Sequence, residues 1–344
     1  MKINAIWKAL AVASVVMAGA TSTQAQSVEE FYSQNDITMV VGTAAGGSTD
    51  FFARTMAPYL SKYIPGNPDI IVQNKPGAGG LITAAELQTT MPSNGSYIAT
   101  LQRNNFTDPL LSDERVDFDA REVKHIGSVG KEIYVIFQYP DEPGTTTVEE
   151  ALNHEMILAA TGSGSANYTY PLLVNELLGG KFKLVPGYSG NEEQALAIER
   201  GEADGRAGTY SMTQRGQLKQ WQEDGKLHYV LQFALEDHPD LAGVPNIFDA
   251  IKDDETRRIF RFMLIPQGLG RIFSAPGDIP EDRLAALREA FVKAAEDPGF
   301  IAEMERSGAE AEYTTGEELQ EMAEELMGTP PAIVDRIKTL ISGS

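Results

Sequence analysis

The 344-residue chain contains no cysteine. This absence excludes disulfide bonds, thiol nucleophiles, cysteine-ligated zinc and a lipid anchor on an N-terminal cysteine. Histidine is scarce as well: His125, His154, His228 and His238 form neither an HExxH motif nor a close pair. We therefore interpret these four as surface or packing residues, and we expect no metal site and no cofactor.

Positive charge is also in short supply. The 28 lysine and arginine residues stand against 49 aspartate and glutamate residues, for a formal net charge of −21. This balance argues against nucleic acid or an anionic membrane surface as a partner. It also provides no long-range attraction for a negatively charged ligand, so a site for an anion has to be built locally.

Long apolar runs are limited to residues 9–20, which are too few to span a membrane. This run follows Lys2 and Lys8 and precedes small residues at 23–25, the pattern of a secretory signal, so residues 1–25 are predicted to be a signal peptide. We expect the mature protein to be soluble and periplasmic. Its length favours two domains of roughly 150 residues each.

Short apolar runs alternate with helical patterns along the rest of the chain. Strands are predicted at residues 37–41, 70–73, 97–101, 124–129, 133–137, 156–160, 182–186, 205–209 and 228–233. Helices are predicted at residues 49–62, 147–153, 170–178, 191–200, 214–223, 280–296, 299–307 and 316–327, with one more ending at 89. Such alternation indicates an α/β fold with parallel-rich sheets.

Two turns rich in glycine and hydroxyl side chains each follow a predicted strand. They are Gly42-Thr-Ala-Ala-Gly-Gly-Ser-Thr-Asp50 and Thr161-Gly-Ser-Gly-Ser-Ala-Asn-Tyr168. A turn from the end of a strand into a helix presents free backbone N–H groups, which bind anions. Asp50 and Arg54 are spaced to form an i,i+4 ion pair in the first turn of the helix that follows.

Proline and serine residues predict where two helices begin. A helix that began at Ser165 would contain Pro171, at a cost of about 3 kcal/mol, so we expect Thr169 to be the N-cap and the second turn to form a nest of N–H groups. Further along, Ser189 and Glu192 have the spacing of a capping box.

Several other functions are disfavoured by single features. The first turn nearly matches a phosphate-binding P-loop, but Ser48 occupies the position of the required lysine. No GxSxG motif provides a nucleophilic serine. The acidic run at 317–325 is interpreted as a solvated helix face rather than a metal site. Either glycine-rich turn could serve geometry alone, but the pair, together with the export signal, favours binding.

The motifs, in their order along the chain, resemble those of the solute receptors of tripartite tricarboxylate transporters, also called Bug-type periplasmic binding proteins. The segments that carry the resemblance are Gly46-Gly-Ser-Thr-Asp50 with Ala53-Arg54, Val72-Gln-Asn-Lys-Pro-Gly-Ala-Gly-Gly80, Met91-Pro-Ser-Asn-Gly-Ser-Tyr97, Gly162-Ser-Gly-Ser165, Val185-Pro-Gly-Tyr-Ser-Gly190, Gly201-Glu-Ala-Asp204, Leu241-Ala-Gly-Val-Pro245 and Ile279-Pro-Glu281. Together they cover essentially the whole mature chain.

The resemblance implies a two-lobed "Venus flytrap" fold with two sheets joined by hinge strands. Residues 26–127 and 237–344 would form the first lobe, and residues 128–236 the second. A ligand would bind between the lobes, and the closed, monomeric receptor would deliver it to a two-component membrane permease.

The two turns are expected to hold a carboxylate through backbone N–H groups. The residues expected to line the ligand site are Thr43, Ala45, Gly46, Gly47, Ser48, Asp50, Arg103, Asn104, Gly162, Ser163, Gly164, Ser165, Tyr168, Tyr188, Ser189, Thr209 and Ser211. Tyr168 stands where relatives often have histidine. Arg103 follows a predicted strand where relatives carry small residues; it is expected either to bind a second carboxylate or to form a surface or lobe–lobe salt bridge.

The function implied is that of an extracytoplasmic receptor for a small organic carboxylate, either a di- or tricarboxylate or an aromatic acid, with no catalytic activity. Two alternatives stay open. A receptor that feeds a sensor kinase would use the same pocket. A periplasmic enzyme acting on a small acid would need a reactive group, which the motifs do not provide.

Overall fold

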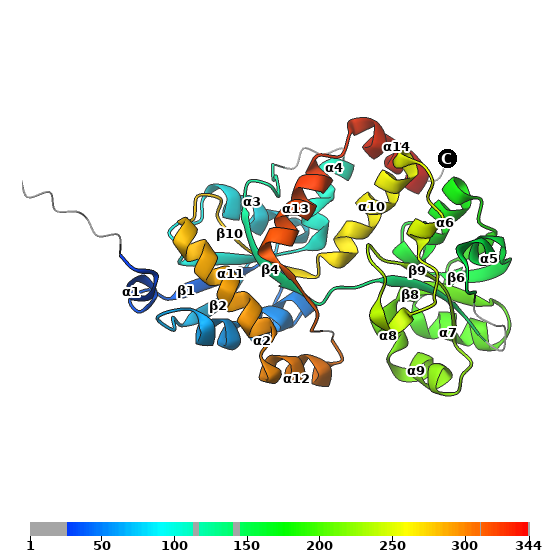
Figure 1. Cartoon of the computed structure of the whole chain (residues 1–344), viewed down its shortest axis with the longest axis horizontal. Coiled ribbons are helices and arrows are strands. Elements are labelled where there is room, and N and C mark those ends of the chain that lie inside the picture. Colours follow the sequence, from blue (N-terminus) through cyan, green and yellow to red (C-terminus); the bar gives the residue numbers. More distant parts are fainter. Residues whose placement is uncertain (1–25, 113–116, 140–144, 310, 343–344) are drawn as a thin grey trace, which may run out of the picture.

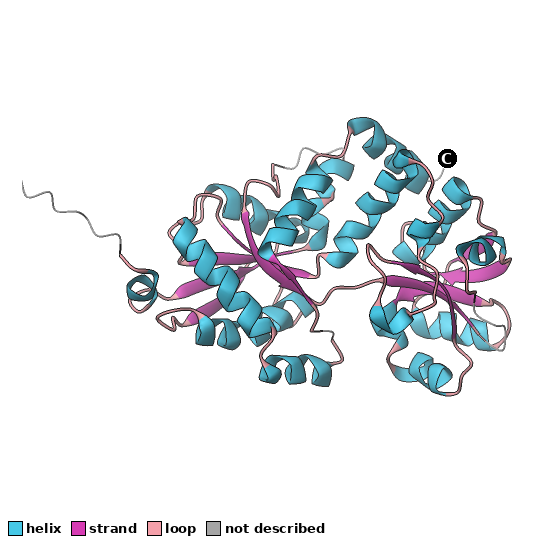
Figure 2. Ribbon diagram, in the orientation of Figure 1, coloured by secondary structure: helices cyan, strands magenta, loops and turns pink. Residues whose placement is uncertain are grey.

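The computed structural model describes residues 26–112, 117–139, 145–309 and 311–342. The described chain forms two groups of helices and strands, each built around its own sheet (Figure 1 and Figure 2). The predicted signal peptide, residues 1–25, lies outside the described residues. Within the described ranges, no helix has both the length and the apolar character that crossing a membrane requires.

The first sheet has the strand order β11-β4-β10-β3-β1-β2. Its strands are β1 (Ile37–Val41), β2 (Ile70–Asn74), β3 (Tyr97–Leu101), β4 (Lys124–Val129), β10 (Arg271–Ala275) and β11 (Tyr313–Thr315). With its helices it makes up the first lobe: α1 (Val28–Tyr32), α2 (Ser48–Tyr63), α3 (Leu81–Thr89), α4 (Asp108–Leu111), α10 (Asp254–Gly268), α11 (Glu281–Ala295), α12 (Pro298–Ser307), α13 (Gly316–Met327) and α14 (Pro331–Ser342).

The second sheet has the strand order β7-β6-β8-β5-β9. Its strands are β5 (Tyr134–Gln138), β6 (Met156–Ala160), β7 (Phe182–Pro186), β8 (Gly205–Thr209) and β9 (His228–Phe233). The helices of this second lobe are α5 (Val148–Asn153), α6 (Ala166–Leu178), α7 (Asn191–Glu199), α8 (Tyr210–Thr213) and α9 (Gly216–Glu223).

The chain crosses between the sheets twice. It leaves the first sheet after β4 and enters the second at β5, and it returns from β9 through α10 to β10 (Figure 1). α10 also joins the two lobes by packing, because its buried Phe260 and Leu264 belong to the same hydrophobic cluster as Tyr170 and Leu173 of α6. The lobe boundaries given above, 26–127 with 237–344 and 128–236, stay a prediction.

Both sheets are mixed, not predominantly parallel as expected. In the first, β1 is parallel to β2 and β3, whereas β10 is antiparallel to β3 and β4, and β11 to β4. In the second, β6 is parallel to β7 and β8, whereas β5 is antiparallel to β8 and β9. Of the antiparallel strands, β5 and β10 each enter a sheet from the other lobe, whereas β11 follows the helices of its own lobe.

The predicted start of α6 is wrong. The helix begins at Ala166 with Ser165 as N-cap, so that Pro171 lies inside it. The Ser165 carbonyl accepts hydrogen bonds from the N–H groups of Tyr168 (3.0 Å) and Thr169 (2.9 Å), which places helical geometry well ahead of the proline. Pro171 is itself buried on the face that packs into the lobe, and we attribute the helix to this tertiary packing, which overrides the local penalty.

The predicted capping box at the start of α7 is displaced by one residue. The N-cap is Gly190, and the carboxylate that reaches back belongs to Glu193 rather than Glu192. The Glu193 carboxylate accepts hydrogen bonds from the backbone N–H (2.5 Å) and the hydroxyl (2.7 Å) of Ser189. The Ser189 hydroxyl is therefore occupied within its own turn.

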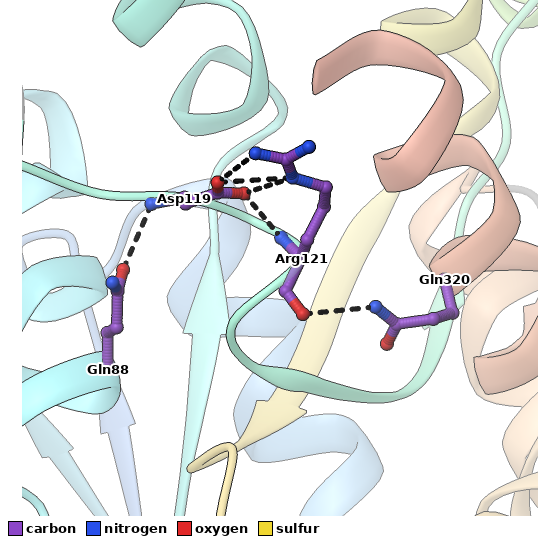
Figure 3. A network of polar contacts seen from close by, with 4 residues as sticks. All are labelled: Gln88, Asp119, Arg121 and Gln320. Carbon is purple, nitrogen blue, oxygen red and sulfur yellow. Dashed lines mark hydrogen bonds and ion pairs between the residues drawn. The ribbon is translucent and has the colours of Figure 1, made fainter. Parts of the chain in front are cut away.

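A polar network holds the segment that leads into β4 (Figure 3). The Asp119 backbone N–H donates to the side-chain oxygen of Gln88 on α3 (2.9 Å), and the Asp119 carboxylate pairs with the Arg121 guanidinium (2.5 Å). Gln320 on α13 donates to the Arg121 carbonyl (3.4 Å). The network ties two helices to the entry of a central strand, far along the sequence from the glycine-rich turns.

Asp297 joins the end of α2 to the start of α12. Its carboxylate accepts hydrogen bonds from Lys62 (2.6 Å), Tyr63 (2.8 Å) and the Gly299 N–H (2.7 Å). The Lys62 ammonium, with the Tyr63 hydroxyl and the Gly299 N–H, lowers the pKa of Asp297 from 3.8 to about 2. The charged form is therefore the one that the folded state favours.

We expect Asp297→Asn to lower the thermal unfolding temperature at pH 7, because it removes the charge while asparagine keeps the cap. A lowered pKa stabilises the fold above the unfolded value of 3.8, and that stability is lost as the pH falls through about 2. Scans of both proteins from pH 7 to pH 2 check this. The difference in unfolding temperature should be constant above the unfolded pKa and shrink towards pH 2; a difference that persists at pH 2 contradicts the assignment.

Candidate ligand-binding cleft

A cleft of about 880 Å³ lies between the two lobes. The first lobe contributes the turn Gly46–Ser48, the aromatic residues Phe51 and Phe52 of α2, and Arg271 of β10, among others. The lining of the second lobe comes from the start of α7, the end of β8, the middle of α8 and the start of α9: Asn191, Glu192, Thr209, Ser211, Met212, Arg215 and Gly216. The volume is in the range that small-molecule sites occupy in proteins.

The first turn presents the N-terminus of α2 to this cleft. The N-cap is Gly47, and no side chain caps the helix. Gly46 adopts a φ of +82°, in the left-handed region that favours glycine. Because a 16-residue helix begins here without a side-chain cap, its first N–H groups are available to a negatively charged ligand.

Asp50 braces the turn from behind. Its carboxylate accepts hydrogen bonds from the Gly46 N–H (2.8 Å), from Arg54 (2.9 Å) and from the amide of Asn74 (2.8 Å). The predicted i,i+4 pair with Arg54 is thus confirmed. Burial alone would raise the pKa of Asp50, but the three hydrogen bonds outweigh it and hold the pKa below its ordinary value. Asp50 is therefore buried, and its carboxylate stabilises the turn through these contacts.

Arg271 is a cation of the cleft that the sequence analysis missed. Its guanidinium donates to the Ser48 hydroxyl (2.8 Å) and stacks over the ring of Phe52, 4.4 Å from the ring centroid. Burial, with a further contribution from the positive charge of Arg103, lowers the pKa of Arg271. A half-buried guanidinium beside a helix N-terminus makes this wall of the cleft electropositive.

The opposite wall carries hydroxyl groups and a carboxylate. Thr209 and Ser211 both line the cleft, with 3.3 Å between their hydroxyl oxygens. The Ser211 hydroxyl donates to both oxygens of Glu132 (3.0 and 2.8 Å). Glu132, which no sequence motif identified, therefore places a carboxylate in the cleft, and its charge raises the pKa of Arg271 against the effect of burial.

The structure does not bring the second turn into the same hollow as the first. Gly164 lines a separate space of about 330 Å³ together with Arg103, Asn104 and Tyr170. Arg103 donates to the side-chain oxygen of Gln267 (2.7 Å), whose amide in turn donates to the Tyr170 hydroxyl (2.8 Å). Arg103 thus belongs to a hydrogen-bonded chain between the lobes.

The other predicted site residues are held by local contacts. The Ser165 hydroxyl donates to the Gly162 carbonyl (2.6 Å), and Asn104 donates to Asp108 (2.7 Å). The Thr43 carbonyl accepts from Asn74 (3.0 Å). Ala45 and Ser163 are exposed, and Tyr168 and Tyr188 are partly buried.

Of the four histidines, His125 is fully buried. One ring nitrogen lies 2.8 Å from the Ser274 hydroxyl oxygen, the other 3.0 Å from the Ala120 carbonyl. Burial lowers its pKa to about 4, so the ring is neutral at physiological pH. Its place is between strands of the first sheet, as a packing residue.

Two α/β lobes joined by two crossings, with a ligand-sized cleft between them, define the class of two-lobed periplasmic binding proteins. Residues 52–339 match the family model described as "Tripartite tricarboxylate transporter family receptor", and the chain belongs to that family. It is 25% identical to the Cupriavidus necator "UPF0065 protein in gbd 5'region" over 332 residues, which cover 94% of each chain.

Solved structures share the fold. One is a TctC solute-binding protein from Polaromonas, solved with no ligand, with a TM-score of 0.70 and 21% sequence identity. The match covers 90% of this chain and 99% of that one. The R. palustris protein Rpa4515, solved with adipate, has a TM-score of 0.51 at 17% identity, with 88% of this chain covering 97% of that one. At these identities the likeness is one of architecture.

Proposed function

We propose that the protein is a periplasmic receptor that captures a small organic carboxylate between its lobes and delivers it to the two-component permease of a tripartite tricarboxylate transporter. One observation carries the proposal: the uncapped N-terminus of α2 and the Arg271 guanidinium meet at Ser48 in the wall of an interlobe cleft. Oriented N–H groups and a guanidinium fork are the groups that bind carboxylates best.

The hydrogen bonds that this wall can donate are sufficient for micromolar binding of a carboxylate. A hydrogen bond to a charged group contributes about 1.5–3 kcal/mol net, and Arg271 with the α2 N-terminus offers several donors. After the costs of association and closure, several such bonds reach the roughly −8 kcal/mol of micromolar binding. Because the net charge of the chain repels anions at a distance, this attraction acts only within the cleft.

Closure completes the proposed site. The turn Gly162–Ser165 opens the uncapped α6 on the second lobe, as Gly46–Ser48 opens α2 on the first. A ligand that contacts both turns only in the closed state shifts the equilibrium towards closure. We propose that the second turn and the hydroxyls of Thr209 and Ser211 then join the first turn around the ligand. Residues 1–25 act in this scheme as the cleaved signal that directs the chain to the periplasm.

Isothermal titration calorimetry with the purified mature chain tests the proposal. The panel contains succinate, malate, citrate, adipate and benzoate, with a neutral sugar and an amine as controls; adipate is included because the R. palustris relative was solved with it. We expect micromolar binding of at least one carboxylate, and recovery of that acid unchanged by mass spectrometry. Binding of the sugar or the amine without any carboxylate contradicts the proposal, and a converted acid indicates an enzyme.

A further inference from the structure

A buried arginine without a carboxylate partner lies behind the second-lobe wall of the cleft. Arg206, on β8, is 1% exposed, and its guanidinium lies 5.8 Å from the ring centroid of Phe137 on the neighbouring strand β5. Among the residues that the structure describes, no aspartate or glutamate forms an ion pair with it. Burial lowers the pKa of Arg206 to about 10. A buried charge with no counter-ion is costly to a fold, so its presence calls for a reason.

The hydrogen bonds of Arg206 leave a surplus of donors. Its Nη1 donates to the side-chain oxygens of Asn191 (3.0 Å) and Gln194 on α7, and its Nη2 contacts the sulfur of Met212. Within the described chain, the Arg206 Nε and the Gln194 Nε2 are buried without a hydrogen-bond partner. A guanidinium has only donors, so the amide oxygen of Asn191 has to face it and the Asn191 NH₂ group has to point elsewhere.

Two of the residues that Arg206 contacts, Asn191 and Met212, line the interlobe cleft. Asn191 is also the first residue of α7. The N-cap of this helix is Gly190, so no N-cap side chain accepts a hydrogen bond from its first N–H groups. The positive end of this helix and the guanidinium therefore both make the electrostatic potential at this wall of the cleft more positive. Glu192 and Arg215 line the cleft from the second lobe as well, but both are exposed, so water screens their charges.

We infer that Arg206 is the buried counter-charge of the bound anion, and that through Asn191 it makes the second lobe selective for a negatively charged group. The Asn191 NH₂ group donates to a ligand carboxylate, while Arg206 holds the oxygen of the same amide and stabilises the anion from behind. Arg206 is a positioning residue that does not touch the ligand. This inference rests on the proposed function.

A comparison with Arg288 shows what a structural arginine looks like in this protein. Arg288 pairs with Glu317 (2.8 Å) and donates to the His125 carbonyl (2.9 Å), so its charge is compensated. A hydrophobic side chain of similar length at position 206 would remove the unpaired charge, but it would also leave the side-chain oxygen of the buried Gln194 without its donor. Proteins keep such destabilising groups where binding requires them.

The decisive variant is Arg206→Met, with Arg288→Met as the matched control. The probes are adipate, or whichever diacid of the panel binds more tightly, and its monoamide. We expect R206M to weaken diacid binding about tenfold or more and to reduce the preference for the diacid over the monoamide. We expect R288M to lower the unfolding temperature and to leave the preference unchanged.

A second variant, Asn191→Asp, avoids the buried site because residue 191 is exposed. It places a carboxylate beside Arg206 as a permanent internal anion. We expect a higher unfolding temperature without ligand and weaker diacid binding. The inference is overturned if R206M weakens diacid and monoamide by the same factor, or if R206M and N191D both bind the diacid as the wild type does. A wild type that binds no acid of the panel refutes the proposed function instead, and the inference with it.

Discussion

Replacement of Arg271 by methionine is expected to weaken carboxylate binding about 100-fold, because truncating one partner of a charged contact in a cleft typically costs 2–5 kcal/mol. Arg271 is the cation nearest the α2 N-terminus by its hydrogen bond to Ser48, and methionine retains part of its packing against Phe52. The unfolding temperature should change little, since Arg271 makes no ion pair among the residues that the structure describes. Calorimetry with the tightest acid of the panel measures the effect.

Arg121→Met provides the control for this substitution. Arg121 is also an arginine of the first lobe, but it pairs with Asp119 (Figure 3), and neither residue is among those that line the cleft. The affinity of the Arg121→Met variant for the acid should equal that of the wild type. If R271M also binds normally, the carboxylate does not lie against the α2 N-terminus. Arg103→Met then tests the smaller hollow, where Arg103 and Gly164 lie together.

The strands of this protein could be predicted because their signals are local. Val40 and Val41 end a short apolar run that is followed at once by Gly42, and each predicted strand forms within a residue of its expected bounds. Two strands were not predicted, β10 (Arg271–Ala275) and β11 (Tyr313–Thr315), and β11 has only three residues, too few to show a periodicity. α6 shows the opposite case, in which the local cost of Pro171 misled the prediction and tertiary packing decided the structure.

In the candidate site, too, residues with local sequence signals could be predicted and residues placed by long-range contacts could not. The turn Gly46–Ser48 could be predicted, since glycine and hydroxyl residues after a strand favour an anion-binding turn whatever the rest of the chain does. Arg271 could not, because it is 223 residues from Ser48 and reaches it only when β10 inserts between β3 and β4. Glu132 and Arg206 could not be predicted either, because their roles depend on contacts with other elements. Glu132 contacts Ser211, and Arg206 contacts Asn191 of α7.

Substitution of Gly164 by valine is expected to abolish most of the binding while leaving the ligand-free protein as stable as before. In the structure no atom lies within 4 Å of a Cβ built at Gly164, and its φ is outside the left-handed region, so a side chain fits without strain. If the turn closes on the ligand, however, that side chain occupies the space through which backbone N–H groups reach the carboxylate. Loss of two such bonds, at roughly 1.5 kcal/mol each, corresponds to about two orders of magnitude in affinity.

Gly164→Ala is the graded control, because its single methyl group should weaken binding less than valine does. Equal unfolding temperatures for the wild type and both variants would show that the effect on affinity does not come from a damaged fold. If G164V instead binds the acid as tightly as the wild type, the second turn takes no part in the site. The ligand would then be held between the α2 N-terminus and the hydroxyls of Thr209 and Ser211, which already line the same cleft.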